Sequence, residues 1–277
     1  MRNLTILVII CGSIFIIKNL NRTISNLNTN YYQAPWPRVY ENKNETKNLD
    51  LSFNKPQKFD YRIKNDVLKI YYINKLNYWN NSESVSGSGS TLNSTKKLRS
   101  ELPTLLKKFQ ISTVLDAPCG DFNWMNVFLK NNELKKYIGG DIVKEIIKAN
   151  NELYIDESKT FIEIDLTKDI LPECDLMICR DCLIHFSYED IYNFLKNFNR
   201  SSIKYLLTTN YHPNKKIYYE NRDIISGDDR LINLMSTPFN FPNSLYSIKE
   251  YDLKNFGSIH MDLFSKSQIS LLKIPVN

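Results

Sequence analysis

Three aspartates between residues 111 and 170 each follow a short, mostly apolar run. Asp116 follows residues 113–115, Asp141 follows 137–140 and Asp165 follows 161–164. Such runs predict buried strands, and the carboxyl ends of parallel strands lie at one edge of a sheet, where open α/β folds bind ligands. We therefore expect these carboxylates to gather at one crevice.

Asp141 has the spacing of a residue that binds a ribose. It lies roughly 20–25 residues past the turn that follows Asp116, the interval at which such folds place a carboxylate on ribose hydroxyls. A carboxylate can accept hydrogen bonds from both hydroxyls. Acids at strand ends also cap the following helix, so each of the three aspartates has a structural alternative.

The turn after Asp116 is made of small residues, namely Ala117, Pro118, Cys119, Gly120 and Asp121. Gly120 allows a positive φ or the close approach of another segment to the backbone. A predicted helical run over 122–129 follows and contains Trp124. Strand, tight turn and helix form the ligand-binding joint of many α/β sheets, although purely structural joints have a similar composition.

Two of the three histidines follow predicted strands. His185 comes after the run 175–181 and His212 after 205–210. Imidazole, with an ordinary pKa of about 6.5, is the natural proton acceptor near neutral pH. We predict His185 as a general base, with Asp181 orienting it or contacting the acceptor, and His212 as the reserve candidate. His185 could instead be structural, or hold a divalent cation with Asp181, but no third ligand has a convincing spacing, so no metal site is predicted.

Helical patterns separate these strands. Residues 143–153 and 188–198 read as helices between strands, and 95–109 forms a helix with a leucine stripe before the first strand. Alternating strands and helices predict an α/β fold with a mostly parallel sheet. Two further strands are expected at 245–250 and 269–276.

Over residues 111–277 the chain resembles the class I S-adenosylmethionine-dependent methyltransferases. The sequence Leu-Asp-Ala-Pro-Cys-Gly-Asp at 115–121 stands at their cofactor loop, within Asp-Ala-Pro-Cys-Gly-Asp-Phe-x-Trp-Met, and Ser-Gly-Ser-Gly-Ser lies upstream. The resemblance implies a doubly wound, Rossmann-like, seven-stranded sheet whose last two strands form an antiparallel hairpin. Asp121 stands where a further glycine is usual, and Pro118 lies in the turn, which leaves a cofactor-free relative as an alternative.

The resemblance also implies roles for particular residues. Asp116 and the Cys119-Gly120 backbone would hold the methionine end of S-adenosylmethionine, Asp141 the ribose, and Asp165 the adenine amino group. Ile142 and Leu166 would be apolar walls. Arg180 would face the cofactor or pair with an acid. The full cofactor-binding set is Asp116, Ala117, Pro118, Cys119, Gly120, Asp121, Trp124, Asp141, Ile142, Asp165, Leu166 and Arg180.

The implied reaction is transfer of a methyl group to an acceptor, for which we expect a sugar or glycan hydroxyl. Ser88, Tyr211 and His212 are the candidate acceptor contacts, although Trp124 and Tyr211 could equally pack in the core. Methylation of a protein or small metabolite, and a non-catalytic glycan- or protein-binding module, remain alternatives. Arg180-Asp181-Cys182-Leu183 lacks the Asn/Asp-Pro-Pro-aromatic run of nucleobase amino-methyltransferases.

Charge and cysteine content narrow the choice of partners. The net charge is +6, but the lysines are interleaved with acids, so a solvated surface is expected and no nucleic acid is predicted as a partner. Cys179 and Cys182 lack a second pair at metal-ligand spacing. We therefore expect buried thiols and neither a zinc site nor a disulfide framework.

The N-terminal quarter differs in composition from the rest. An apolar run over 4–17, within segment 1–20, predicts an uncleaved signal-anchor or transmembrane helix and a single-pass membrane protein. It is short for a span, so a cleaved signal of a secreted or lumenal protein, or a buried element, is the alternative. Residues 21–55 read as a polar linker, 56–94 as a helical cap with a Ser/Gly loop, and 95–277 as the catalytic domain.

Overall fold

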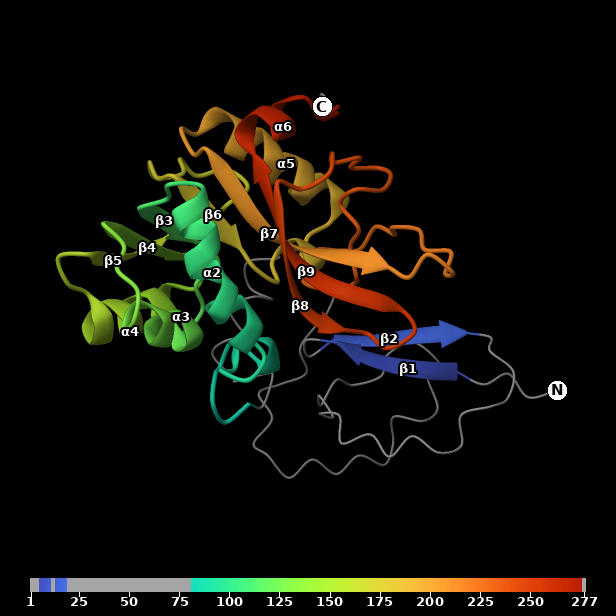
Figure 1. The fold of residues 1–277 in the computed structure, drawn as a ribbon, viewed down its shortest axis with the longest axis horizontal. Coiled ribbons are helices and arrows are strands. Elements are labelled where there is room, and N and C mark those ends of the chain that lie inside the picture. Colours follow the sequence, from blue (N-terminus) through green and yellow to red (C-terminus); the bar gives the residue numbers. More distant parts are fainter. Residues whose placement is uncertain (1–4, 11–12, 19–80, 276–277) are drawn as a thin grey trace.

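The computed structural model describes residues 5–10, 13–18 and 81–275 of the chain. Its centre is a seven-stranded sheet with the order β5-β4-β3-β6-β7-β9-β8 (Figure 1). The first five strands are parallel, whereas β9 runs antiparallel to both β7 and β8. This arrangement confirms the predicted fold class. The strands are β3 (Thr113–Asp116), β4 (Lys136–Asp141), β5 (Lys159–Glu163), β6 (Leu176–Cys179), β7 (Tyr205–Pro213), β8 (Tyr246–Asp252) and β9 (Gly257–Ser265).

Helices cover both faces of this sheet (Figure 1). One apolar core lies between the sheet and α2 (Lys96–Lys108), α3 (Asn123–Leu129) and α4 (Lys144–Tyr154). A second lies between the sheet and α5 (Tyr188–Arg200) and α6 (Lys266–Ser270). Successive side chains of a strand point to opposite faces of the sheet. Val114 therefore packs in the core on the α2 side, and Leu115 packs in the core on the α5 side. Two short 3₁₀ turns, η1 (Ser88–Ser90) and η2 (Leu183–His185), complete the elements.

The predicted helices agree with the structure to within two residues at each end. In α2 the buried side chains are Leu98, Leu102, Leu105 and Leu106, which form one stripe against the sheet. In α5 the Ser187 hydroxyl caps the N-terminus by accepting from the backbone N–H of Asp190. Helical spacing was therefore sufficient to place both helices.

The prediction of a final strand at 269–276 is wrong. The last strand is β9, and Ile269 belongs to α6, where it is fully buried. A capping box between Ser265 and Gln268 starts that helix directly after the strand. The expected antiparallel hairpin exists, but it joins β8 to β9. No strand was predicted over 257–265, although Ile259, Met261 and Leu263 alternate there with polar residues, which is a strand pattern.

The N-terminal predictions remain largely untested. Residues Thr5–Ile10 (β1) and Ser13–Lys18 (β2) pair as a two-stranded antiparallel sheet, where a membrane helix was expected. Among the described residues, none of the helices combines the length and apolarity that a bilayer crossing requires. The predicted linker 21–55 and the helical part of the predicted cap, 59–79, lie outside the described residues. The membrane anchor stays a prediction.

Candidate active site

The loop after β3 folds over the end of β4. Asp116 pairs with Gly139, so Asp141 extends two residues further along the sheet edge. The carboxylate of Asp141 accepts the Gly120 N–H at 3.0 Å on Oδ2 and the Val143 N–H at 3.0 Å on Oδ1. The two strand ends and the glycine turn that sequence spacing had linked are thus in direct contact.

Gly120 is held on three sides. Its N–H donates to Asp141, and its carbonyl accepts from the Asn150 side chain of α4 at 2.8 Å. On the third side a Cβ at position 120 would lie 2.1 Å from Oγ of Ser86, and the backbone φ is +52°. Both the crowding and the left-handed conformation require glycine. Asn150 was missed because no recognisable motif surrounds it, whereas Ser86 belongs to the Ser/Gly stretch, from which only Ser88 was put forward.

Asp121, the departure from the family pattern, anchors the Ser/Gly stretch. Its Oδ1 accepts from the Ser84 hydroxyl at 2.9 Å, and its Oδ2 accepts from the Val85 N–H at 2.8 Å. The Asp121 N–H in turn donates to the Ser86 hydroxyl at 3.0 Å. The segment 84–86 is therefore docked on the turn and is not a free linker. Ser88 lies just beyond it in η1, where its carbonyl accepts from the Ser94 hydroxyl.

We expect Gly120→Ala to destabilise the chain by more than about 2 kcal/mol, because a left-handed residue with a Cβ costs about 1–2 kcal/mol before any clash. In a Ser86→Gly background the clash disappears, so the same substitution should cost at least about 1 kcal/mol less. Urea unfolding of the four proteins in this double-mutant cycle measures the coupling. Additive effects would show that Ser86 does not pack on Gly120.

Asp116 and Asp141 are buried acids with perturbed protonation. Asp116 is 2% exposed, and burial raises its pKa to about 7 even though its carboxylate accepts a 2.8 Å hydrogen bond from the Tyr137 hydroxyl. Burial likewise raises the pKa of Asp141 to about 6, against the effect of its backbone hydrogen bonds. Ionised carboxylates in this setting would be stabilised by a positively charged ligand.

These shifts predict a pH-dependent difference between Asp116→Asn and the unchanged chain. The pKa of Asp116 is raised in the folded state. Its burial therefore leaves the free energy of unfolding unchanged below about pH 4 and lowers it increasingly between about pH 4 and pH 7. A neutral amide at this position carries no such cost, so the free energy of unfolding of the variant should rise relative to wild type by on the order of 2 kcal/mol between pH 5 and pH 8. Urea unfolding at both pH values measures the change. The buried amide adds an offset that does not vary with pH, so a constant difference would contradict the prediction.

Asp165 caps its own turn. Its Oδ1 accepts from the N–H and hydroxyl of Thr167 at 2.9 and 2.6 Å, and its Oδ2 pairs with Lys168 at 2.8 Å. Burial opposes ionisation, but these hydrogen bonds hold the pKa below its ordinary value. Leu166 is buried in the core on the α5 side, whereas Ile142 stays partly exposed. The geometry thus favours the structural alternative for Asp165, and the adenine contact stays a prediction.

Arg180 pairs with acids, the second of its two expected roles. Its Nε donates to Glu250 at 3.0 Å, and its guanidinium contacts the Asp181 carboxylate at 3.0 Å. Burial raises the pKa of Glu250 to about 7, although the positive charge of Arg180 opposes the shift. Glu250 comes from β8, at the far edge of the sheet, so nothing local in the sequence predicts this pair.

Two aromatic candidates belong to the core. Trp124 lies on α3, is 5% exposed and packs in the core between α2, α3 and the sheet. Tyr211 is 2% exposed, and its hydroxyl donates to the Phe256 carbonyl. The structure therefore gives both side chains the packing role that was the alternative to lining a pocket. The four described cysteines are buried and free, as predicted.

His185 is oriented by a loop distant in sequence. Its Nδ1 lies 2.9 Å from the backbone carbonyl of Asp228. A carbonyl can only accept, so in the neutral ring this contact favours the tautomer with the proton on Nδ1 and the lone pair on Nε2. This is the tautomer of a proton acceptor. The Gly227 N–H also donates to the His185 carbonyl at 2.8 Å, which ties the loop to η2.

Asp181 contacts Thr209 and Arg180, and its predicted orienting contact with His185 stays a prediction. Its Oδ1 accepts from the Thr209 hydroxyl at 3.1 Å, and its Oδ2 faces Arg180. Asp181 has φ +50° and its N–H also donates to Thr209, so the segment just after β6 is joined to the middle of β7. A contact between Asp181 and an acceptor stays a prediction.

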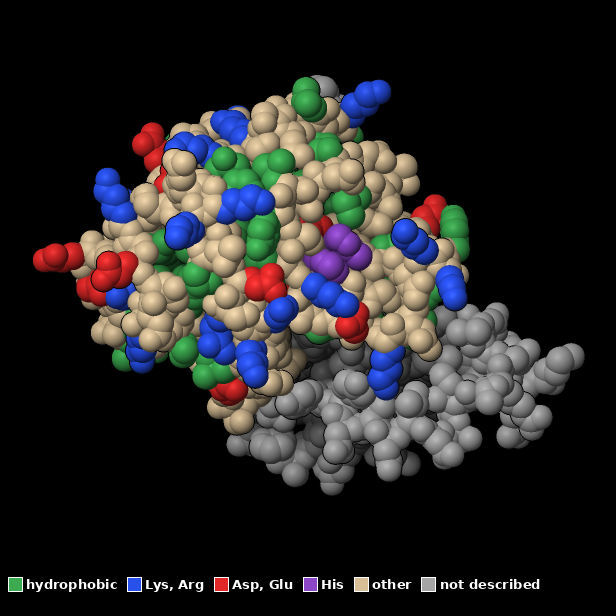
Figure 2. Space-filling model, in the orientation of Figure 1, with side chains coloured by type: hydrophobic (Ala, Val, Ile, Leu, Met, Phe, Trp, Pro, Cys, Tyr) green, Lys and Arg blue, Asp and Glu red, His purple; other side chains and the backbone are tan. Residues whose placement is uncertain are grey.

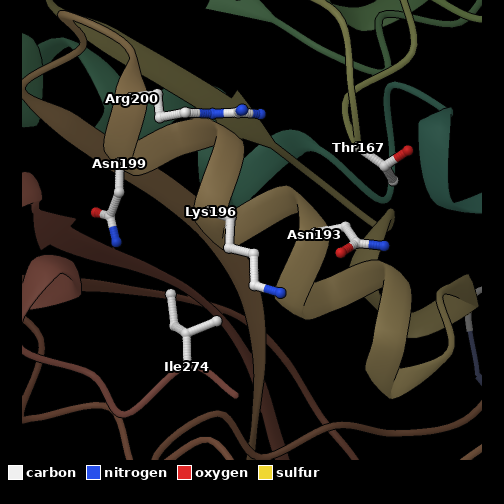
Figure 3. A pocket seen from close by; sticks show the side chains of 6 residues that line it. All are labelled: Thr167, Asn193, Lys196, Asn199, Arg200 and Ile274. Atoms are coloured by element: carbon white, nitrogen blue, oxygen red, sulfur yellow. The ribbon is translucent and has the colours of Figure 1, made fainter. Parts of the chain in front are cut away.

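One hollow lies away from these residues. It is lined by side chains of α5, by Thr167 and by the C-terminal Ile274 (Figure 3). None of the predicted site residues contributes to it. We therefore do not assign it to the candidate active site.

No protein-family model matches the chain, and no curated protein matches it in sequence. Several solved structures have a similar chain path. The methyltransferase domain of bacterial CtHen1 is 15% identical over 62% of this chain and 98% of that chain, with a TM-score of 0.47. Magnesium protoporphyrin IX methyltransferase from Synechocystis, with bound SAH, is 14% identical over 72% and 99%, with a TM-score of 0.48. Human N-acetylserotonin methyltransferase, in complex with SAM, is 13% identical over 72% and 56%, with a TM-score of 0.46.

Proposed function

We propose that this chain is an S-adenosylmethionine-dependent methyltransferase. The observation that carries the proposal is the contact between the Gly120 turn after β3 and the Asp141 carboxylate that ends β4. A glycine turn and an acid on the adjacent strand are the two parts that α/β sheets use to hold a nucleoside at their carboxyl edge. The order of the seven strands agrees with this use.

The residues at this edge fit S-adenosylmethionine. Asp141 accepts two backbone hydrogen bonds, and a carboxylate offers about four acceptor positions, so acceptors remain for ribose hydroxyls. The sulfonium and ammonium groups of the cofactor are positive, and positive charge stabilises the ionised forms of Asp116 and Asp141. When bound, the cofactor supplies an electrophilic methyl group.

For the acceptor we propose a sugar or glycan hydroxyl. A hydroxyl has a high pKa, so its attack needs a base that takes the proton. His185 would supply Nε2 for this purpose, because the Asp228 carbonyl holds the proton on Nδ1. The loop 226–230 that fixes this tautomer would then position the base through backbone contacts.

A product analysis tests the proposal. The full chain would be incubated with S-adenosylmethionine and a panel of nucleotide sugars, oligosaccharides, a peptide mixture and small phenols and amines. Mass spectrometry should find a product heavier by one CH₂, about 14 Da, among the carbohydrates, together with S-adenosylhomocysteine. Methylation of peptides or small metabolites only would overturn the carbohydrate acceptor but keep the enzyme class. No product and no binding of S-adenosylhomocysteine would favour a non-catalytic binding module.

A further inference from the structure

Strands β7 and β9 carry a cluster of metal-ligating side chains outside the candidate active site. His212, His260 and Asp262 each offer one ligand atom, and these atoms all lie within 4.8 Å of one another. The two imidazole rings are stacked, with centroids 3.9 Å apart and planes at 9°. Histidine side chains gather at the surface in Figure 2, so an ion could reach them from solvent.

Asp262 is the buried member of this cluster. Its side chain is fully buried, and Oδ2 accepts from Asn210 and from Nε2 of His212, both at 2.7 Å. Its second oxygen, Oδ1, is buried and has no hydrogen bond of good geometry from the described residues, although the Ser247 hydroxyl opposite it on β8 helps to lower the pKa of Asp262. An incompletely satisfied buried carboxylate calls for a specific explanation, such as a bound ion or water.

The strand next to His260 carries one lysine, which is already paired. Lys249 of β8 lies opposite His260 and pairs with Asp252 at 2.6 Å, which offsets its repulsion of an incoming cation.

Supporting hydrogen bonds for the ligands are already in place. The hydroxyls of Ser247 and Ser258 lie 2.8 Å from Nδ1 and Nε2 of His260, respectively. One of these nitrogens can exchange its serine hydrogen bond for a metal ion while the other nitrogen keeps its hydrogen bond to serine. Such an outer hydrogen bond usually fixes the orientation of a ligating imidazole. Asn210 does the same for the carboxylate of Asp262.

We propose that His212, His260 and Asp262 bind one divalent transition-metal ion of the zinc type, with water completing the coordination. Two nitrogens and one carboxylate oxygen are a common donor set for zinc. Ligand atoms about 2.1 Å from zinc at a tetrahedral angle lie about 3.4 Å apart. The 2.7 Å separation of His212 Nε2 and Asp262 Oδ2 therefore needs to widen by less than about 1 Å. One of the two stacked imidazoles also has to rotate, because a metal ion lies in the plane of each ring that binds it.

This site differs from the cation site that the sequence left open at Asp181 and His185. Asp181 contacts Thr209, whereas the cluster uses His212 and therefore the opposite face of β7, because side chains alternate along a strand. The metal would join β7 to β9 at His212, further along β7 than Thr209, which contacts Asp181. Its binding does not depend on S-adenosylmethionine, so failure of either proposal leaves the other testable.

Cobalt binding tests the site in the full chain after removal of metals with a chelator. We expect one Co²⁺ per chain with visible ligand-field absorption, displaced by Zn²⁺, and a higher Tm with either ion. His212→Gln and His260→Gln should each weaken Co²⁺ binding at least tenfold. His185→Gln, the one other histidine in the sequence, is the matched control and should bind as wild type does.

Three results would overturn the proposal. These are substoichiometric Co²⁺ binding, equal binding in both cluster variants and wild type, and a thiolate-to-cobalt charge-transfer band that places the ion on a cysteine. Because His212 and His260 are partly exposed, the two glutamine variants are expected to fold. Near-native unfolding curves without metal would verify this, whereas a substitution at the buried Asp262 would confound ion loss with misfolding.

Discussion

Replacing His185 with alanine is expected to lower methyl-transfer turnover by on the order of 10²–10⁴, the usual contribution of a general base. The physical reason is the tautomer. The Asp228 carbonyl accepts the Nδ1 proton at 2.9 Å and leaves the lone pair on Nε2. The affinity for S-adenosylhomocysteine should change less than about threefold, because His185 follows β6 and takes no part in the Gly120–Asp141 contact. Steady-state kinetics and a binding titration on the same protein separate the two effects.

His212→Ala is the matched comparison, since His212 was the reserve candidate for the base. The structure pairs His212 with Asp262 and gives it no contact with His185 among the hydrogen bonds of the described residues. Its removal should therefore reduce turnover much less than removal of His185. If His185→Ala kept full turnover while His212→Ala lost it, the proton acceptor would be His212 and the role given to the Asp228 carbonyl would be wrong.

Replacing Asp141 with alanine should weaken binding of S-adenosylhomocysteine by about 10²-fold or more. Hydrogen bonds to a charged group contribute about 1.5–3 kcal/mol each, and Asp141 would accept from ribose hydroxyls while also holding the Gly120 N–H. Asp141→Asn keeps one acceptor oxygen and should lose less affinity than Asp141→Ala. Isothermal titration of both variants gives the two dissociation constants.

Asp165→Ala provides the control on the neighbouring strand end. The Asp165 carboxylate accepts a hydrogen bond from Thr167 and pairs with Lys168. The alanine variant should therefore lose less than about fivefold in affinity for S-adenosylhomocysteine. Equal losses for Asp141→Ala and Asp165→Ala would mean that Asp165 turns to the ligand on binding. In that case the adenine contact implied by the family resemblance would be supported, and the turn-capping role would be secondary.

Local pattern predicted the parts of this site that lie on single elements. The strand ends at Asp116 and Asp141 follow from β-branched runs, and α2 follows from its leucine spacing. Strand order then brings the ends together, because parallel strands share one carboxyl edge. The same patterns could not separate Asp141, which holds the glycine turn, from Asp165, which caps its own loop, since both are acids after apolar runs.

Contacts made by backbone atoms or by distant strands had no signature in the sequence. His185 is oriented by the carbonyl of Asp228, to which any residue type could contribute. Arg180 is paired with Glu250 from β8, and Asp262 is buried on β9, where it accepts hydrogen bonds from two side chains of β7. In each case the partner lies more than forty residues away along the chain and is brought close only by sheet order.

Asp121 shows how a departure from a family pattern can be compensated. A glycine at this position would leave Ser84, Val85 and Ser86 without the carboxylate that holds them. The docked segment in turn closes over Gly120, where the extra side chain of a non-glycine residue would collide with Ser86. The aspartate and the Ser/Gly stretch therefore hold each other in place.

Calorimetric titration of the full chain with S-adenosylhomocysteine tests most directly whether the Gly120 turn and Asp141 form a nucleoside site. We predict one site per chain, with binding weakened about 10²-fold in Asp141→Ala and maintained in Asp165→Ala. Absence of binding heat at several temperatures, in a chain whose unfolding curve shows that it is folded, would contradict the proposed function. Full-affinity binding by Asp141→Ala would place the nucleoside elsewhere.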